Sequence, residues 1–251
     1  MPTDIRILKT LRTAGRKDVR TALLTAEKSC AEYMNSIESD VEKIFALEKA
    51  KGYQNAFIIV DKTKSTAYVC REGKVVDRLD IGVGEEVGDN LNRVAYYNGT
   101  FLEEGKTTPP GCFCTVEPCI ARTPNIEEFE NGNDINALVL DGVQHPADYW
   151  YRTTIGLHQV PNSHPERIEM FAQKGQRRSM STGCVNFLTE DFKRMIGEIR
   201  PTGTSVYILP EDAGNKLEVV SLPNGLWMKT KYADEKKENI LLEAMKKMMK
   251  L

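Results

Sequence analysis

Residues 56–83 read AFIIVDKTKSTAYVCREGKVVDRLDIGV, and this stretch decides the fold. Apolar runs at 56–60, 66–70 and 75–83 alternate with polar segments at 61–65 and 71–74. Short runs rich in Val, Ile and aromatic residues predict β-strands, and a Gly-containing polar pair between two of them predicts a hairpin turn. We therefore expect three consecutive strands joined by tight turns.

The same pattern continues along the chain without a fixed repeat. Further strands are predicted at residues 113–116, 137–140, 154–158 and 205–209. Residues 188–199 have helical spacing and stop before Pro201, which disfavours a helix at the residue before it. Short strands with turn signals predict a mostly β domain, sandwich or barrel-like, with one or two helices.

An amphipathic helix is predicted before this domain, over residues 17–51. Its apolar residues recur every three or four positions: Leu23, Ala26, Cys30, Tyr33, Ile37, Val41, Ile44 and Leu47. Such spacing suits a coiled coil or a helix packed on its own domain, and the short length favours the second. Gly52 marks the end of the helix.

The tail predicts a short hairpin around Pro223–Gly225 and a Met-rich amphipathic helix over residues 239–251. Such a helix can touch a membrane, a partner or its own protein, and its mixed charges favour its own protein. We therefore expect no membrane contact. The predicted organisation is an N-terminal extension at 1–52, a main domain at 53–210 and a C-terminal extension at 211–251.

Composition excludes several classes of function. The 251 residues include 34 Lys plus Arg and 36 Asp plus Glu, a net charge of −2. This balance gives no basic footprint for nucleic acid, so no nucleic-acid partner is expected. The first 20 residues lack the apolar core of a secretory signal. Either the protein acts in the cytoplasm, or its export signal lies outside this sequence, or it is exported by a non-standard route.

Cysteine usage points away from a disulfide framework. Six cysteines in a chain of this length do not resemble a small secreted scaffold. Cys112, Cys114 and Cys119 lie close together, but a metal knuckle needs a fourth ligand, which only a distant residue such as His145 would supply. We expect strand and loop thiols there, and no metal.

The segment 179–186, SMSTGCVN, is the sharpest chemical feature. Gly183 lets the backbone turn tightly before Cys184, so that amide groups can converge beside the sulfur as an oxyanion hole. A nucleophilic thiol needs a base, and only three histidines exist. His158 ends an apolar strand-like run, whereas His145 and His164 lie in polar loops.

Several segments, in order, resemble the catalytic domain of the L,D-transpeptidases, also called YkuD-like. Residues 181–184 match the family's Ser/Thr-x-Gly-Cys box, and residues 155–158 match its strand-borne histidine. Residues 108–113, TPPGCF, resemble its Thr-Pro-x-Gly-x-Phe segment, and residues 57–84 resemble its first strands. The resemblance covers about residues 53–210 and implies that family's fold.

The resemblance implies roles for individual residues. Cys184 would be the nucleophile and His158 the general base, with Ser181 orienting the imidazole and the Gly183 amide in the oxyanion hole. Four residues would contact substrate: Thr182, Asn186, Arg177 and Arg178.

Three departures from the family pattern stand out. Gln159 follows the histidine where glycine is common, and Asn186 stands where many members have arginine. Arg177 or Arg178 would compensate for that arginine. Insertions are expected at 161–178 and between Gly84 and Lys106. His164 lies in the first of these and is therefore a competitor for the role of base.

By resemblance, the substrate is a peptidoglycan stem peptide, the intermediate is a thioester, and no cofactor is needed. An amine acceptor gives a cross-link, whereas water gives carboxypeptidase or endopeptidase activity. A non-catalytic wall-associated module is the remaining alternative. A carbapenem-type β-lactam should acylate Cys184, and the function places the protein in the cell envelope.

Overall fold

The computed structural model describes residues 17–89, 106–119, 137–144, 149–161, 164–222 and 225–233. Its helices are α2 (Lys17–Asn35), α3 (Asp40–Ala50), α4 (Pro165–Met170) and α5 (Thr189–Glu198). Its strands are β1 (Phe57–Asp61), β2 (Thr66–Arg71), β3 (Lys74–Gly84), β4 (Gly111–Cys119), β5 (Ala137–Gln144), β6 (Tyr149–Gln159), β7 (Ser179–Ser181), β8 (Val185–Phe187), β9 (Ser205–Ile208), β10 (Lys216–Leu222) and β11 (Gly225–Lys231).

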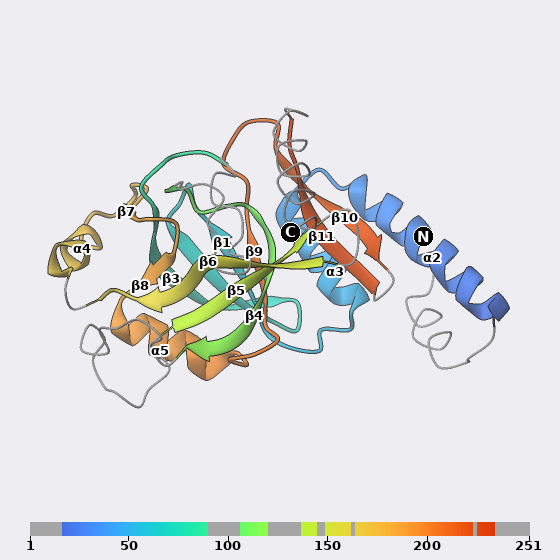
Figure 1. Cartoon of the computed structure of the whole chain (residues 1–251), viewed down its shortest axis with the longest axis horizontal. Coiled ribbons are helices and arrows are strands. Elements are labelled where there is room, and N and C mark those ends of the chain that lie inside the picture. Colours follow the sequence, from blue (N-terminus) through green and yellow to red (C-terminus); the bar gives the residue numbers. More distant parts are fainter. Residues whose placement is uncertain are drawn as a thin grey trace, which may run out of the picture.

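Within these residues, nine strands form one sheet in the order β2-β1-β9-β4-β5-β6-β8-β3-β7. An additional pairing of β2 with β3 joins the two sides, so the sheet closes into a barrel (Figure 1). The mostly β, barrel-like fold is therefore confirmed. The β2–β3 hairpin is also confirmed, since Glu72 and Gly73 both have positive φ, as a tight hairpin turn of the primed type requires.

The main core lies between the barrel strands and α5. Phe192 and Met195 on α5 pack there with apolar residues of the strands, including Ile58, Val60, Leu79, Ile81, Phe113, Leu138, Leu157, Phe187 and Val206. Strand β1 is buried along its whole length. Its alternate residues Phe57 and Ile59 belong to a second core on the other side of the strand.

The second core joins the two terminal extensions. Helices α2 and α3 and the β10–β11 hairpin lie together at one end of the barrel, opposite α4 (Figure 1). Their apolar side chains, Ala31, Met34, Ile44, Leu47, Leu217, Val219, Leu226 and Met228, meet the outward face of the barrel strands. The predicted domain boundaries stay a prediction, but the extensions share one core with the barrel.

Side chains from the helices hold the backbone of β10. Asn35 donates from Nδ2 to the Val219 carbonyl (2.9 Å) and accepts from the Val219 amide at Oδ1 (2.7 Å). Asp40 accepts from the Leu217 amide (3.0 Å), and Lys43 donates to the Leu217 carbonyl (3.0 Å). These side chains pair with backbone groups at the edge of β10 that would otherwise need another strand.

The predicted single helix at 17–51 is wrong in one respect, because it breaks into α2 and α3. Ser39 is the N-cap of α3 and its hydroxyl accepts from the Glu42 amide (3.3 Å). The break places Asn35 and Asp40 against β10. The C-terminal hairpin is confirmed as β10–β11, whereas the predicted helix at 239–251 and most of the predicted insertion before Lys106 lie outside the described residues.

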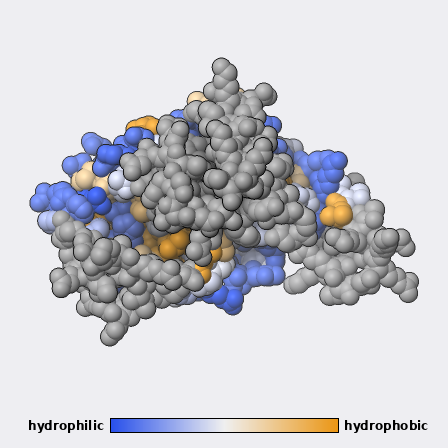
Figure 2. Space-filling model, in the orientation of Figure 1, coloured by the Kyte–Doolittle hydropathy of each residue, from blue (hydrophilic) through white to orange (hydrophobic). Residues whose placement is uncertain are grey.

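On the viewed face, hydrophilic side chains predominate at the left end of the molecule, and hydrophobic side chains are visible near its middle (Figure 2). No helix among those described has the length and apolar character needed to cross a membrane.

Candidate active site

Cys184 lies in the turn between β7 and β8. Both short strands pair with β3, β7 in parallel and β8 antiparallel, so the chain must reverse between them. Gly183 makes this reversal with φ of 124°, a backbone conformation that favours glycine. The sequence argument for a tight turn before Cys184 is therefore confirmed.

His158 reaches Cys184 because β6 lies beside β8. The two strands run parallel with His158 opposite Asn186, and the imidazole forms a side-chain hydrogen bond with Cys184. The other ring nitrogen, Nδ1, lies 2.7 Å from the Gln159 carbonyl oxygen. A carbonyl only accepts, so Nδ1 carries a hydrogen and Nε2 is left for the sulfur.

The environment raises the pKa of His158. Burial alone lowers it, but the hydrogen bond and charge of Cys184, together with the Gln159 carbonyl, outweigh burial and raise the pKa above the ordinary histidine value. A base whose protonated form is stabilised by a neighbouring sulfur favours the thiolate, which is the reactive form of cysteine.

A backbone amide also contacts the sulfur. The Gly156 N–H donates to Cys184 Sγ at 3.4 Å. Gly156 lies two residues before His158 on β6, and a Cβ there would lie 2.9 Å from the Leu138 carbonyl oxygen of β5. A glycine at this position allows the close approach of β5 and β6.

The predicted roles of Ser181 and Gly183 stay predictions, and the contacts described for both residues lie within the turn. The Ser181 hydroxyl donates to the Cys184 carbonyl (2.6 Å) and accepts from the Gly183 amide (3.1 Å), and the Ser181 carbonyl accepts from the Glu85 amide (2.8 Å). Ser181 thus braces the turn, and the carbonyl that orients the imidazole is that of Gln159. The Gly183 amide points to Ser181 Oγ.

The predicted substrate contact of Asn186 also stays a prediction, and its described contacts are internal. Its side chain is fully buried and donates from Nδ2 to the Cys184 carbonyl at 3.1 Å. Asn186 therefore stabilises the turn through the Cys184 carbonyl. Thr182, by contrast, is exposed at the tip of the turn, where contact with a substrate remains a prediction.

Arg178 does not offer its charge to a substrate. It is 3% exposed, and its guanidinium donates to the Ser65 carbonyl and to Asp80, each at 3.2 Å. The guanidinium also lies over the Phe171 ring, 5.4 Å from its centroid. This arginine fastens the segment before β7 to the barrel.

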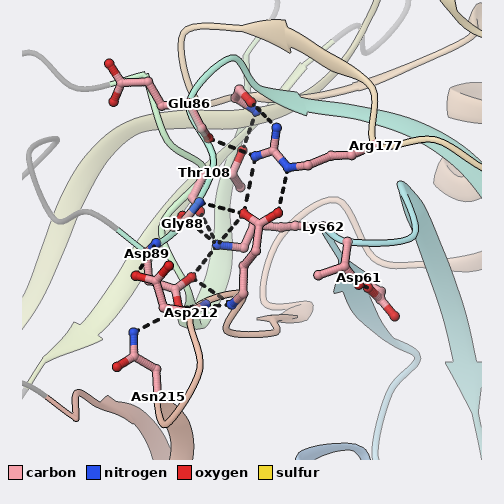
Figure 3. Close-up of polar contacts among 12 residues, drawn as sticks. Asp61, Lys62, Glu86, Gly88, Asp89, Thr108, Arg177, Asp212 and Asn215 are labelled. Carbon is pink, nitrogen blue, oxygen red and sulfur yellow. Dashed lines mark hydrogen bonds and ion pairs between the residues drawn. The ribbon is translucent and has the colours of Figure 1, made fainter.

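Arg177 is tied into a buried ionic network (Figure 3). It donates to Glu211 at 2.7 Å and to the carbonyls of Gly84 (2.9 Å) and Glu86 (2.8 Å). The predicted role of Arg177 in substrate binding is therefore not supported by its contacts, which join the end of β3 to the segment after β9.

Lys62 and Asp89 form the centre of this network. Lys62 Nζ lies 2.5 Å from Asp89 Oδ1 and also donates to the Gly88 and Thr108 carbonyls, with both charged side chains fully buried. Burial lowers the pKa of Lys62. For Asp89, Lys62 and the donors of Asn215 and Asp212 outweigh burial and lower the carboxyl pKa.

The segment at 161–178 carries α4, which the sequence analysis did not predict. His164, 44% exposed, pairs with Glu166 at the start of this helix (2.9 Å) and is therefore turned to solvent. Arg167 on the same helix lies near enough to lower the pKa of His158 slightly by its charge. No sequence pattern singles out Arg167, because only the fold brings its charge near His158.

The other described cysteines behave as apolar residues. Cys70 and Cys112 are buried, and burial raises the pKa of each thiol to about 12. No grouping of three or more potential metal ligands occurs in the part of the chain that the structure describes, which leaves out the Cys119 side chain and His145.

Comparisons with known proteins agree with this architecture. Residues 55–208 match the L,D-transpeptidase catalytic domain family (YkuD). No curated protein matches the chain.

Solved structures that the comparison matches to this chain include an L,D-transpeptidase from Mycobacterium smegmatis (16% identity, TM-score 0.33, 61% of this chain and 58% of that one). Others are the catalytic domain of the E. faecium L,D-transpeptidase (19%, 0.32, 61% and 96%) and the helical cell shape determining protein Pgp2 from Campylobacter jejuni (14%, 0.38, 63% and 48%).

The match thus spans little more than half of the M. smegmatis protein and about half of Pgp2. The family match itself covers more than half of the present chain. The chain therefore belongs to the YkuD family of L,D-transpeptidase catalytic domains.

Proposed function

We propose that the protein is a cysteine acyltransferase that acts on peptidoglycan stem peptides, with Cys184 as nucleophile and His158 as base. The observation that carries this proposal is the hydrogen bond between the two side chains, with Nδ1 of His158 held by the Gln159 carbonyl. A nucleophile, a base within hydrogen-bond reach and a group that orients the base are the parts that such catalysis needs.

The proposed reaction has two halves. His158 takes the thiol proton, Cys184 Sγ bonds to the substrate carbonyl carbon, and the carbonyl electron pair moves to oxygen. The tetrahedral intermediate collapses, the bond to the terminal D-amino acid breaks, and His158 returns the proton to the leaving amine. An acceptor amine then attacks the thioester and restores the thiol, whereas water in its place gives hydrolysis.

We propose Arg167 as the cation that meets the carboxylate of the donor peptide. Arg177 and Arg178 are held by protein groups and Asn186 is buried, whereas Arg167 is half-buried on α4, near His158. Arg167→Gln should raise KM for a donor ending in a free carboxylate and change KM little for its amide. An equal effect on both donors would contradict this assignment.

The substrate implies a location in the cell envelope, and the chemistry implies acylation by a carbapenem-type β-lactam. Both are proposals that rest on the family and on the Cys184–His158 pair.

The test is a stem-peptide assay with mass-spectrometric detection, run with and without an added amine acceptor. Cys184→Ala should abolish product, and His158→Ala should lose nearly as much because the two residues act as a unit. His164→Ala is the matched control and should retain activity. Cross-linked product with the amine supports transfer, hydrolysed product alone supports the hydrolase alternative, and full activity of Cys184→Ala would contradict the proposal.

A further inference from the structure

Thr108 links the segment before β4 to the backbone of the catalytic turn. Its side chain is fully buried. The hydroxyl accepts from the Gly84 amide at 2.8 Å and lies 2.9 Å from the Gly183 carbonyl oxygen. A hydroxyl has one hydrogen, and the amide can only donate, so the hydrogen of Thr108 must go to the Gly183 carbonyl.

The position of Thr108 is itself fixed from two sides. A Cβ at Gly84 would lie 2.1 Å from the Lys106 carbonyl oxygen and 2.7 Å from the Thr108 nitrogen, so only glycine permits this approach. On the other side, Lys62 donates to the Thr108 carbonyl at 3.0 Å as part of the buried network (Figure 3). Thr108 therefore connects the Gly183 carbonyl to a rigid part of the structure.

The contact with Gly183 has a consequence for the next amide. In a trans peptide the carbonyl and the following N–H point in opposite directions. Because Thr108 holds the Gly183 carbonyl, it also sets the direction of the Cys184 N–H, away from Thr108. The Gly183 amide is directed at Ser181 Oγ, so the Cys184 amide is the donor of this turn that the proposed mechanism needs.

We propose that Thr108 is a positioning residue, whose hydroxyl holds the Gly183–Cys184 peptide so that the Cys184 N–H meets the oxyanion formed during acyl transfer. The inference rests on the proposed function in taking Cys184 as the nucleophile. In the step concerned, the S–C bond forms, the carbonyl electron pair moves to oxygen, and that oxygen accepts from the Cys184 amide until the leaving group departs.

The experiment compares two reactions of the same sulfur. Acylation by p-nitrophenyl acetate passes through an oxyanion, whereas alkylation by iodoacetamide does not. Both rates are measured at Cys184 by peptide mapping, as a function of pH. Thr108→Val should slow acylation by about 10- to 100-fold relative to alkylation, the range expected for a misaligned donor. Thr108→Ser keeps the hydroxyl and should restore the wild-type ratio.

Thr115→Val is the matched control. Thr115 is equally buried, and its hydroxyl accepts from the Thr204 amide at 2.9 Å elsewhere in the sheet. It should lose stability and keep the ratio of the two rates. Thr108→Ala removes the same hydroxyl with less crowding and serves in case the valine variant does not fold.

An unchanged ratio in Thr108→Val or Thr108→Ala would overturn the inference, as would an equal fall in both rates or a failure of serine to restore the ratio. A wild type that p-nitrophenyl acetate acylates no faster than Cys184→Ala would also overturn it. If the wild type shows the expected ratio but leaves stem peptides unchanged, the proposed substrate is wrong while the role of Thr108 stands.

Discussion

The sulfur of Cys184 has two described polar neighbours, the His158 imidazole and the Gly156 amide. Both favour negative charge on sulfur, one as a cation when protonated and the other as a fixed dipole. Ser181 and Asn186 converge instead on the Cys184 carbonyl, which holds the residue in place without touching its thiol. At the scale of single residues, the site separates groups that contact the Cys184 thiol from groups that hold its backbone.

The titration of His158 tests this separation. Its raised pKa depends on the hydrogen bond and charge of Cys184, because burial acts in the opposite direction. Cys184→Ala should therefore lower the pKa of His158, as measured by NMR titration of the imidazole. Asn186→Ala keeps the thiol and serves as the control with a smaller shift. An unchanged pKa in Cys184→Ala would mean that sulfur does not set the charge of the base.

Sequence patterns predict which residues belong to this site better than they predict which contacts those residues make. A histidine at the end of an apolar strand and a cysteine after glycine are local signals, and the fold brings the two together. The partners of Arg177 and Lys62 are not local, since Glu211 and Asp89 come from distant segments. Nothing in the spacing of residues 177 and 178 reveals which charges they will neutralise.

At the scale of elements, a buried ionic network connects β1, the end of β3, the segment before β4 and the segment after β9. Charged groups without water are stable only when nearly every hydrogen-bonding position is filled. Asp89 meets this condition, because Lys62, Asn215 and the amides of Glu211 and Asp212 all donate to it. The network therefore holds together the strand ends that surround the turn carrying Cys184.

A double-mutant cycle measures this coupling. Lys62→Met should lower the free energy of unfolding by roughly 3–5 kcal/mol, because it leaves Asp89 as a buried charge without its cation. The double variant Lys62→Met/Asp89→Asn should lose less than the sum of the single changes. Lys64→Met removes an exposed cation from the buried Asp61, whose carboxylate keeps the Thr63 hydroxyl and the Lys64 amide as donors, and should cost less than Lys62→Met in denaturant unfolding. Strict additivity would argue against a coupled pair.

Acid unfolding gives a second test of Asp89. Its folded-state pKa lies below the ordinary value, so the folded protein holds that proton less tightly than the unfolded chain does. Its contribution to stability is complete above the unfolded carboxyl pKa of about 4 and is lost as the pH falls through the lowered pKa. Asp89→Asn should make the free energy of unfolding fall less steeply as the pH is lowered into the acidic range. An unchanged slope would contradict the lowered pKa.

At the scale of the whole molecule, the two ends of the described chain fold against each other. Sequence periodicity predicts the N-terminal helical segment and the Pro223–Gly225 turn signal predicts the C-terminal hairpin. Neither predicts that Asn35, Asp40 and Lys43 hold the backbone of β10. The pattern also misses the break between α2 and α3, because the apolar spacing continues across it. Short-range periodicity predicts which face of a helix is apolar, but it does not predict which distant element covers that face.

Asn35 tests the dependence of one extension on the other. Asn35→Ala leaves both backbone groups of Val219 without their side-chain partner and should destabilise the protein by roughly 1–3 kcal/mol. Ser36→Ala, whose hydroxyl forms only an exposed local bond to the Tyr33 carbonyl, is the matched control. Amide exchange of Val219 should rise in the first variant alone. Equal exchange in the two variants would show that the helices do not protect β10.

The most direct test of Cys184 as the nucleophile is the mass of the intact protein after exposure to a stem peptide or a carbapenem. The wild type should gain one acyl group, peptide mapping should place this group on Cys184, and Cys184→Ala should gain none. An acyl group on any other residue, or the same gain in mass by Cys184→Ala, would contradict the assignment of Cys184 as the nucleophile.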